Sequence, residues 1–342
     1  MIGLALAALA FTAAAPDPTA GMSARQLAGQ RIVTGFSGTS APRSLLRRIH
    51  RGELGGVIVF SANISSRKQL RTLTRSLQRA RPKGAPPLIV SIDQEGGLVK
   101  RLSGAPTRSA AQMGARNSAG AARRQGVATA RNLRGVGLNV DLAPVLDVAR
   151  PGSIMEQQRR SFSRSASHVA RIGGAFARGL DAGNVAATGK HFPGLGAAQR
   201  NQDLQVNRIG LNLKTLRRVD ERPYATAPGD LQLVMLSSAI YPALSKAPAV
   251  FSRRVVNAEL RGHVGFRGVT ISDALDASAM SRYGSRGRRA VRAAKAGVDL
   301  LLYTSDGSAL KALVAATRSG SLSRAALRTS ARRTLKLRAS LR

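Results

Sequence analysis

The sequence contains no cysteine and no tryptophan, and acidic residues are scarce in it. The absence of cysteine excludes disulfide bonds, thiolate metal sites, cysteine nucleophiles and attachment of a lipid to an N-terminal cysteine. Aromatic residues make up only 4% of the chain, which argues against stacked aromatic platforms for single-stranded nucleic acid. The 342 residues are nevertheless 43% hydrophobic, so the chain can bury a full core and we do not expect it to be disordered.

Basic residues outnumber acidic residues by 54 to 17, which gives a formal net charge of +37. Such an excess predicts a weak, salt-sensitive attraction to polyanions, including nucleic acid and an anionic cell wall or membrane surface. The basic residues are scattered, often in pairs, and form no single dense tract. This distribution favours a generally arginine-rich surface, and we expect no specific nucleic-acid partner.

The chain starts with an apolar run at residues 2–15, which ends in small residues before Pro16. This pattern is typical of a secretory signal peptide, although no Lys or Arg precedes the run, and it is short for a transmembrane helix. We expect residues 1–20 to form a signal peptide or an uncleaved N-terminal anchor. The protein would then be secreted or held in the cell envelope, with no other membrane-spanning segment.

Along residues 21–342, short β-branched apolar runs alternate with stretches of helical spacing. The runs predict strands at 31–36, 55–60, 87–93, 137–145, 185–192, 231–239, 268–274 and 298–304. Predicted helices include 67–80, 119–134, 167–182, 253–264 and 285–296, with one or two more in 307–342. Continuous apolar strands separated by helices are typical of a parallel sheet covered on both faces. Eight such units predict the α/β class and a single-domain (β/α)8 barrel of the TIM type.

Six of the 17 acidic residues lie at or just after the ends of these predicted strands. They are Asp93, Glu95, Asp147, Asp203, Asp273 and Asp276, and Lys190 and His191 lie at the same rim. Barrel active sites are built there. The carboxylates could instead neutralise neighbouring arginines, but their concentration at one rim favours a functional site. Two carboxyl groups that face a sugar are what glycoside hydrolysis requires, one at the anomeric carbon and one as proton donor.

Three motifs lie at the ends of the third, fifth and seventh predicted strands. They are SIDQEGGLVKRL at 91–102, KHFPGLG at 190–196 and GVTISDALDASAM at 268–280. Together with supporting segments between about residues 28 and 305, they resemble glycoside hydrolase family 3 in its short, single-domain β-N-acetylglucosaminidase branch. The resemblance implies hydrolysis of a terminal β-linked aminosugar, from peptidoglycan fragments or another glycan, without a cofactor or metal.

The resemblance also implies a role for each matching residue. Asp273 takes the place of the nucleophile, which attacks the anomeric carbon and forms a covalent glycosyl-enzyme with net retention. Asp93 would accept hydrogen bonds from sugar hydroxyls. The basic residues of the motifs would hold the sugar and help to keep Asp273 ionised; these are Arg101, Arg160, Lys190 and His191.

Other residues near these motifs are expected to have structural roles. Gly96 and Gly97 would permit a tight turn at the rim, and Glu95 would brace Arg101 or Lys190. Supporting roles are expected for Asp147 and Asp276. The remaining histidines lie in predicted helices without metal-ligand spacing, so no metal site is predicted; they are His50, His168 and His263.

The loop after KHFPG departs from the family pattern. There the family carries an Asp-x-His pair whose histidine is the general acid/base, whereas this chain has Asn201 and Asp203 at those positions, and Leu195 also replaces a histidine. Three interpretations follow. Asp203 is itself the acid/base, with a pKa raised by burial or by the nearby charge of Asp273. Alternatively Asp203 binds substrate while Glu95 or another residue supplies the proton, or the site is catalytically weak and retained for glycan binding.

A β-glucosidase on the same barrel is the nearest alternative activity. Larger members of the family with that activity take their acid/base residue from an added domain, for which this chain has no sequence segment. We therefore expect the aminosugar specificity.

Overall fold

The strands form one parallel sheet in the order β10-β1-β2-β3-β6-β7-β8-β9. The computed structural model describes residues 17–226, 228–305, 307 and 309–341, so the apolar run at 2–15 lies outside it. The strands are β1 (Ile32–Thr34), β2 (Gly56–Val59), β3 (Ile89–Ile92), β6 (Val140–Asp141), β7 (Ala186–Phe192), β8 (Leu233–Leu236), β9 (Val269–Ser272) and β10 (Leu301–Tyr303). A parallel bridge between Ile271 and Leu300 joins the two ends of the sheet, which closes the barrel.

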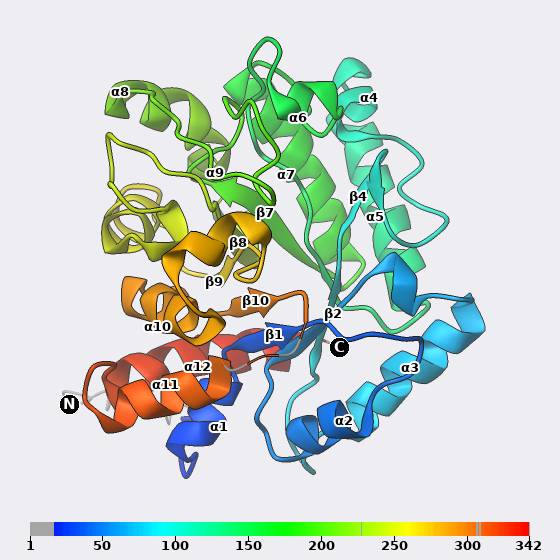
Figure 1. The fold of residues 1–342 in the computed structure, drawn as a ribbon. Helices are drawn as coiled ribbons and strands as arrows, with labels where there is room; N and C mark the ends of the chain where they lie inside the picture. The colour runs from blue at the N-terminus through cyan, green and yellow to red at the C-terminus, as the bar shows by residue number, and fades with distance from the viewer. Residues whose placement is uncertain (1–16, 227, 306, 308, 342) are drawn as a thin grey trace, which may run out of the picture.

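Helices form an outer layer around the strands (Figure 1). The principal ones are α2 (Arg43–His50), α3 (Arg67–Arg79), α5 (Ala119–Arg134), α7 (Ala166–Ala182), α9 (Arg222–Thr226), η5 (Arg254–His263), α10 (Arg286–Ala296), α11 (Ala309–Arg318) and α12 (Arg324–Ser340). Shorter segments are α1 (Ala24–Gly29), η1 (Ser61–Asn63), α4 (Ala110–Ala115), α6 (Ile154–Gln157), α8 (Leu213–Thr215), η2 (Leu216–Asp220), η3 (Pro228–Asp230), η4 (Ala249–Phe251) and η6 (Ser278–Tyr283). The antiparallel pair β4 (Gln94–Gly96) and β5 (Val99–Lys100) lies outside the barrel sheet.

The predicted α/β class and (β/α)8 barrel are confirmed, and each of the eight predicted strands contains an observed one. Helix α5 coincides with its predicted bounds, and 307–342 contains α11 and α12. Helix α3 shows why such predictions succeed. Its Leu70, Leu73 and Leu77 are buried on one face, while the Ser66 hydroxyl accepts the backbone N–H of Gln69 and caps its start.

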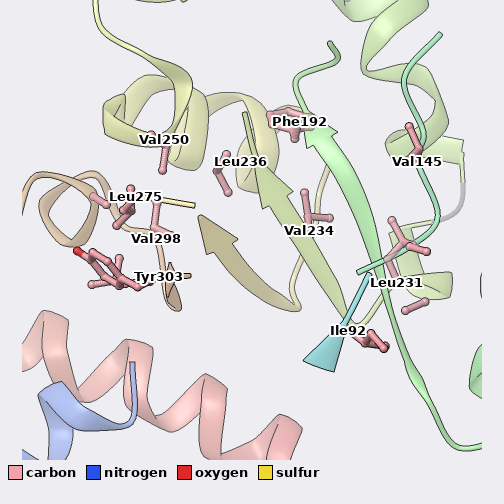
Figure 2. Packing of buried hydrophobic residues seen from close by; sticks show 14 of the residues in the cluster. Ile92, Val145, Phe192, Leu231, Val234, Leu236, Val250, Leu275, Val298 and Tyr303 are labelled. Atoms are coloured by element: carbon pink, nitrogen blue, oxygen red, sulfur yellow. The ribbon is translucent and has the colours of Figure 1, made fainter. Parts of the chain in front are cut away.

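Two hydrophobic clusters lie on opposite faces of the sheet, because successive side chains of a strand alternate in direction. The smaller cluster fills the barrel interior and includes Val33, Ile58, Ile89, Val140, Leu142, Leu233, Met235, Ile271 and Leu302. The larger one lies between the sheet and the helices. Figure 2 shows Val234 and Leu236 of β8 in this outer layer, with Phe192 of β7. Strands buried on both faces explain their continuous apolar sequences.

Helix α12 closes the end of the barrel at which the strands begin. Leu337 and Leu341 join the interior cluster, and the Arg338 side chain donates hydrogen bonds to the carbonyls of Pro86 and Pro87, just before β3. No helix in the described part of the chain is both long and apolar enough to cross a bilayer. The opposite end, where the strands finish, is the end left open for a site.

Substitution of Leu337 by Ala tests the role of α12. Leu337 is 7% exposed, and its truncation leaves a cavity beneath the barrel interior. We expect the free energy of unfolding to fall by about 2–4 kcal/mol. Urea denaturation followed by circular dichroism measures this change. The control is Leu98→Ala, at a leucine that is 73% exposed, for which we expect a change within about 0.5 kcal/mol. Equal effects of the two substitutions would contradict a stabilising contact of Leu337 with the barrel interior.

Candidate functional site

A cavity of about 480 Å³ opens where the barrel strands end. Its polar and charged lining comprises Asp93, Glu95, Arg101, Gln158, Arg160, Lys190, His191, Asn201, Gln202, Asp203, Asp273, Ser278 and Thr304. Every residue that the sequence predicted to act on substrate is in this set. Parallel strands end at one rim, which is why side chains far apart in the sequence meet in one cavity.

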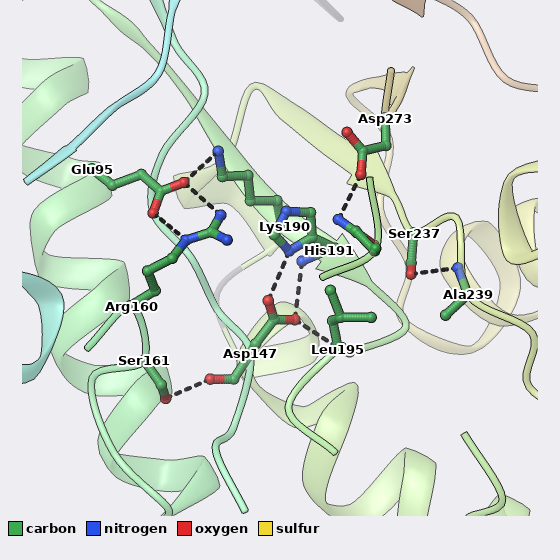
Figure 3. A network of polar contacts seen from close by, with 12 residues as sticks. Glu95, Asp147, Arg160, Ser161, Lys190, His191, Leu195, Ser237, Ala239 and Asp273 are labelled. Carbon is green, nitrogen blue, oxygen red and sulfur yellow. Dashed lines mark hydrogen bonds and ion pairs between the residues drawn. The ribbon is translucent and has the colours of Figure 1, made fainter. Parts of the chain in front are cut away.

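Lys190 is the centre of a buried ion network (Figure 3). Its side chain is 3% exposed, and its Nζ lies 2.6 Å from Asp93 Oδ1 and 2.7 Å from Glu95 Oε1. The Arg160 guanidinium donates two hydrogen bonds to Glu95, from Nε to Oε2 and from Nη2 to Oε1, both 2.8 Å long. The positive charges of Lys190 and Arg160 and the negative charges of Asp93 and Glu95 thus compensate one another in a largely buried position.

The charge state of Glu95 is set by its partners. Burial alone would raise the pKa of Glu95, but the charges of Arg160 and Lys190 and their hydrogen bonds lower it to about 2. A carboxyl group with that pKa carries no proton near neutral pH. Glu95 therefore cannot serve as the general acid, which removes it as the alternative proton donor considered from the sequence.

The prediction that Glu95 braces Lys190 is confirmed, but its arginine partner is Arg160 and not Arg101. Because both ends of the Arg160 guanidinium bind Glu95, Arg160 holds Glu95 beside Lys190.

Arg101 follows β5 at the wall of the cavity, and its buried Nε has no hydrogen-bond partner in the described structure. Arg101 thus retains an unused donor beside the cavity.

The β4–β5 turn needs both of its glycines. Gly96 and Gly97 have φ values of 92° and 63°, in the left-handed region that side chains disfavour. A Cβ on Gly96 would also lie 2.3 Å from the Arg108 carbonyl oxygen. The turn lets the chain reverse directly after Glu95, so that Glu95 and Arg101 line the same cavity.

Asp147 orients His191 from below the cavity (Figure 3). Its Oδ2 lies 2.7 Å from His191 Nδ1, and its Oδ1 accepts the backbone N–H groups of His191 and Leu195. Because a carboxylate accepts hydrogen bonds, His191 Nδ1 is the donor in this contact, which fixes the orientation of the ring. Asp147 is fully buried, in agreement with its predicted supporting role.

Asp273 lies directly after β9, and both of its carboxylate oxygens are hydrogen-bonded. Oδ1 accepts the backbone N–H of Ala274 at 2.8 Å, and Oδ2 accepts Nε2 of Gln202 at 2.6 Å. A carboxylate accepts hydrogen bonds, so Gln202 must direct its NH2 group toward Asp273. The other amide atom, Gln202 Oε1, is buried and has no hydrogen-bond partner in the described residues. Gln202 thus connects the loop after β7 to the residue predicted to be the nucleophile.

Asp203 is held over the same cavity by its backbone. Its carbonyl oxygen accepts the Ser278 hydroxyl at 2.8 Å and the Ala279 N–H at 3.0 Å. Although part of the residue is exposed to solvent, desolvation of its carboxyl group by the surrounding walls raises the pKa of Asp203, and the charge of Asp273 raises it further. This direction is the one required of a carboxylic acid that donates a proton.

The sequence did not single out Gln202 or the apolar residues that line the cavity. Gln202 lies between Asn201 and Asp203, but a glutamine in a loop carries no periodic or charge signal. Asp276, expected to be structural, accepts the backbone N–H of Thr304 at 2.8 Å and ties together the loops after β9 and β10. Only the folded structure shows that Gln202 contacts Asp273 and that Asp276 joins two loops.

Comparison with known proteins places the chain among sugar hydrolases. Residues 32–337 match the model of the glycosyl hydrolase family 3 N terminal domain. The chain is 38% identical over 334 residues to an uncharacterized secreted glycosyl hydrolase of Arthroderma benhamiae, covering 94% of this chain and 95% of that protein. It is 34% identical over 281 residues to a β-hexosaminidase of Pseudomonas aeruginosa, covering 81% and 82%.

Solved structures give the same result. A family 3 β-N-acetylglucosaminidase from Paenibacillus sp. str. FPU-7 matches with a TM-score of 0.89 and 33% identity, covering 94% of this chain but only 63% of that one. The β-N-acetylhexosaminidase from Beutenbergia cavernae matches with a TM-score of 0.85 and 29% identity, covering 93% and 99%.

Replacement of Gln202 by Ala tests whether its hydrogen bond to Asp273 holds the loop. A bond to a charged group contributes about 1.5–3 kcal/mol, so we expect at least about tenfold faster amide exchange in residues 199–206. Hydrogen–deuterium exchange with mass spectrometry measures it. Gln205→Ala is the control, because Gln205 lies on the same loop but contacts Arg200 at the surface. Unchanged exchange in Gln202→Ala would show that the loop is held by other contacts.

Proposed function

The chain belongs to glycoside hydrolase family 3 and is a glycosidase; from this we propose that it removes terminal β-linked N-acetylglucosamine-type residues with retention of configuration. The observation that carries the proposal is that Asp273 and Asp203 face one cavity together with the Lys190–Asp93 ion pair. The relatives named β-hexosaminidase and β-N-acetylglucosaminidase support an aminosugar over a glucoside as the substrate.

In the first step, a carboxylate oxygen of Asp273 forms a bond to the anomeric carbon while the bond from that carbon to the glycosidic oxygen breaks. Asp203 transfers its proton to the departing oxygen, which leaves as an alcohol. In the second step, the Asp203 carboxylate accepts a proton from water as the water oxygen attacks the anomeric carbon. Asp273 is thereby released, and both carboxyl groups return to their initial protonation states.

The ion network supplies the groups that would hold the sugar. Lys190 has three N–H donors and uses two for Asp93 and Glu95, which leaves one for a hydroxyl. The Asp93 side chain is 17% exposed toward the cavity and can accept from a sugar hydroxyl. His191 and Arg101, which also line the cavity, complete the set. Arg160 contributes indirectly, because its fork positions Glu95.

Secretion or retention in the cell envelope belongs to the same proposal. The apolar run at residues 2–15 and the name of the secreted Arthroderma benhamiae relative support it. The net charge of +37 supports an additional electrostatic association with an anionic cell wall, which would weaken as salt concentration rises.

A panel of 4-nitrophenyl glycosides tests the sugar and the nucleophile together. We expect the wild-type protein to prefer the β-N-acetylglucosaminide over the β-glucoside, and Asp273→Asn to lose at least about a thousandfold in kcat, because an amide is a poor nucleophile. A fluorinated, activated glycoside should accumulate as an adduct on Asp273, identifiable by mass spectrometry. A wild-type protein that binds the sugar but hydrolyses no member of the panel would support the binding-only interpretation instead.

Asp203→Asn tests the proton donor. Because a donor acts in its protonated form and the pKa of Asp203 is raised, wild-type kcat/KM should remain high above the usual range for an aspartic acid and fall only as pH rises through that elevated pKa. Asp203→Asn should lose about 10²–10⁴-fold on a poor leaving group, much less on an activated one, and lack the basic limb of the profile. The control is Asp181→Asn, near the C-terminal end of α7 and outside the cavity lining, for which we expect the wild-type pH profile. Wild-type activity of Asp203→Asn on a poor leaving group would remove Asp203 from the mechanism.

A further inference from the structure

We propose that the mouth of the cavity binds an apolar aglycone, such as an alkyl or aryl alcohol, and that Leu204 is the residue that selects it. This inference rests on the proposed function. Two large hydrophobic side chains are strongly exposed in the described part of the chain, Leu98 at 73% and Leu204 at 67%. Leu204 lines the cavity, whereas Leu98 lies in the β4–β5 turn beside it.

The position of Leu204 relative to the reacting atoms determines what it contacts. The proton donor must reach the glycosidic oxygen, and the aglycone begins directly beyond that oxygen. Leu204 follows Asp203 in the chain, and the Asp203 carbonyl is fixed by Ser278 and Ala279. The Leu204 side chain therefore borders the path of the leaving group and not the pocket that holds the sugar.

Further apolar side chains line the cavity in segments that contact the loop carrying Asp203. Ile154, at the start of α6, is one of them, and its backbone N–H donates to the Ala198 carbonyl of this loop at 2.9 Å. Ala277 is another, and it directly precedes Ser278, whose hydroxyl donates to the Asp203 carbonyl. Both are half-buried, so each keeps surface that a ligand can cover. Ile154, Leu204 and Ala277 form what we call the apolar lip.

The charges of the cavity are confined to the part that would hold the sugar and the reacting atoms. Lys190 and Glu95 are each 3% exposed, deep in the site. Despite the net charge of +37, the basic side chains that line the cavity are Arg101, Arg160, Lys190 and His191, all of them assigned to the sugar or its ion network. The apolar lip itself carries no charge. An anionic aglycone would find no dedicated partner there, whereas an apolar one would remove Leu204 from water.

A series of alkyl β-N-acetylglucosaminides tests the inference. The alcohols from butanol to octanol are almost equally acidic, so the chemical step is constant while the apolar surface grows. For wild type we expect kcat/KM to rise about two- to fourfold for each methylene that reaches the lip. Leu204→Asn should flatten this dependence, and Leu204→Met should retain it. The matched control Leu98→Asn removes the other exposed leucine and should leave the slope unchanged.

The outcomes separate this inference from the proposed function. Hydrolysis of the nitrophenyl and methyl glycosides with no dependence on chain length in wild type would overturn the apolar lip and leave the glycosidase intact. A slope that persists in Leu204→Asn, or that Leu98→Asn abolishes equally, would overturn the assignment to Leu204. Failure to hydrolyse any of these glycosides would instead overturn the proposed function itself, and the inference with it.

Discussion

The buried ammonium group of Lys190 is the interaction on which the site depends. It connects β7 to two carboxylates that follow β3, Asp93 and Glu95, and through Glu95 to Arg160 in the segment after β6. Removal of any one charge would leave another uncompensated in a largely buried position, which costs far more than loss of an exposed pair. The network therefore holds three neighbouring barrel segments in one arrangement, and it does so beside the place where a sugar would bind.

The Asp273 side of the site is held differently. Asp273 receives one backbone hydrogen bond from its own segment and one side-chain hydrogen bond from Gln202, and the loop that carries Gln202 also carries Asp203. Three hydrogen bonds, and not ion pairs, connect this loop to the segment after β9. The ion network thus faces a part of the cavity in which one loop brings the carboxyl groups of Asp203 and Asp273 together. The relative position of these two carboxyl groups therefore depends on the position of that loop.

The large positive charge has a structural counterpart inside the protein. Several of the scarce carboxylates pair with arginines away from the cavity, as Asp299 does with Arg261 and Arg333, and Glu259 with Arg217. At the rim, Glu95 lines the cavity and also pairs with an arginine, so the two interpretations of the rim carboxylates apply to the same residue. The carboxylate of each of these pairs is buried, so the arginine compensates a charge that water does not reach, unlike the exposed charges that dominate the composition.

The sequence by itself predicted the barrel and the charged residues that line the cavity. Strands buried on both faces must be apolar throughout, so their runs were visible at positions such as 89–92 and 269–272, and parallel strands necessarily bring Asp93, Lys190 and Asp273 to one rim. Only the tertiary structure decided which of these groups bind each other. The pairing of Arg160 with Glu95, the contact of Gln202 with Asp273 and the exposure of Leu204 at the mouth depend on loop conformations. Loops have no repeating pattern in sequence, and these contacts join residues 65 or more positions apart, so distances and burial appear only once the chain is folded.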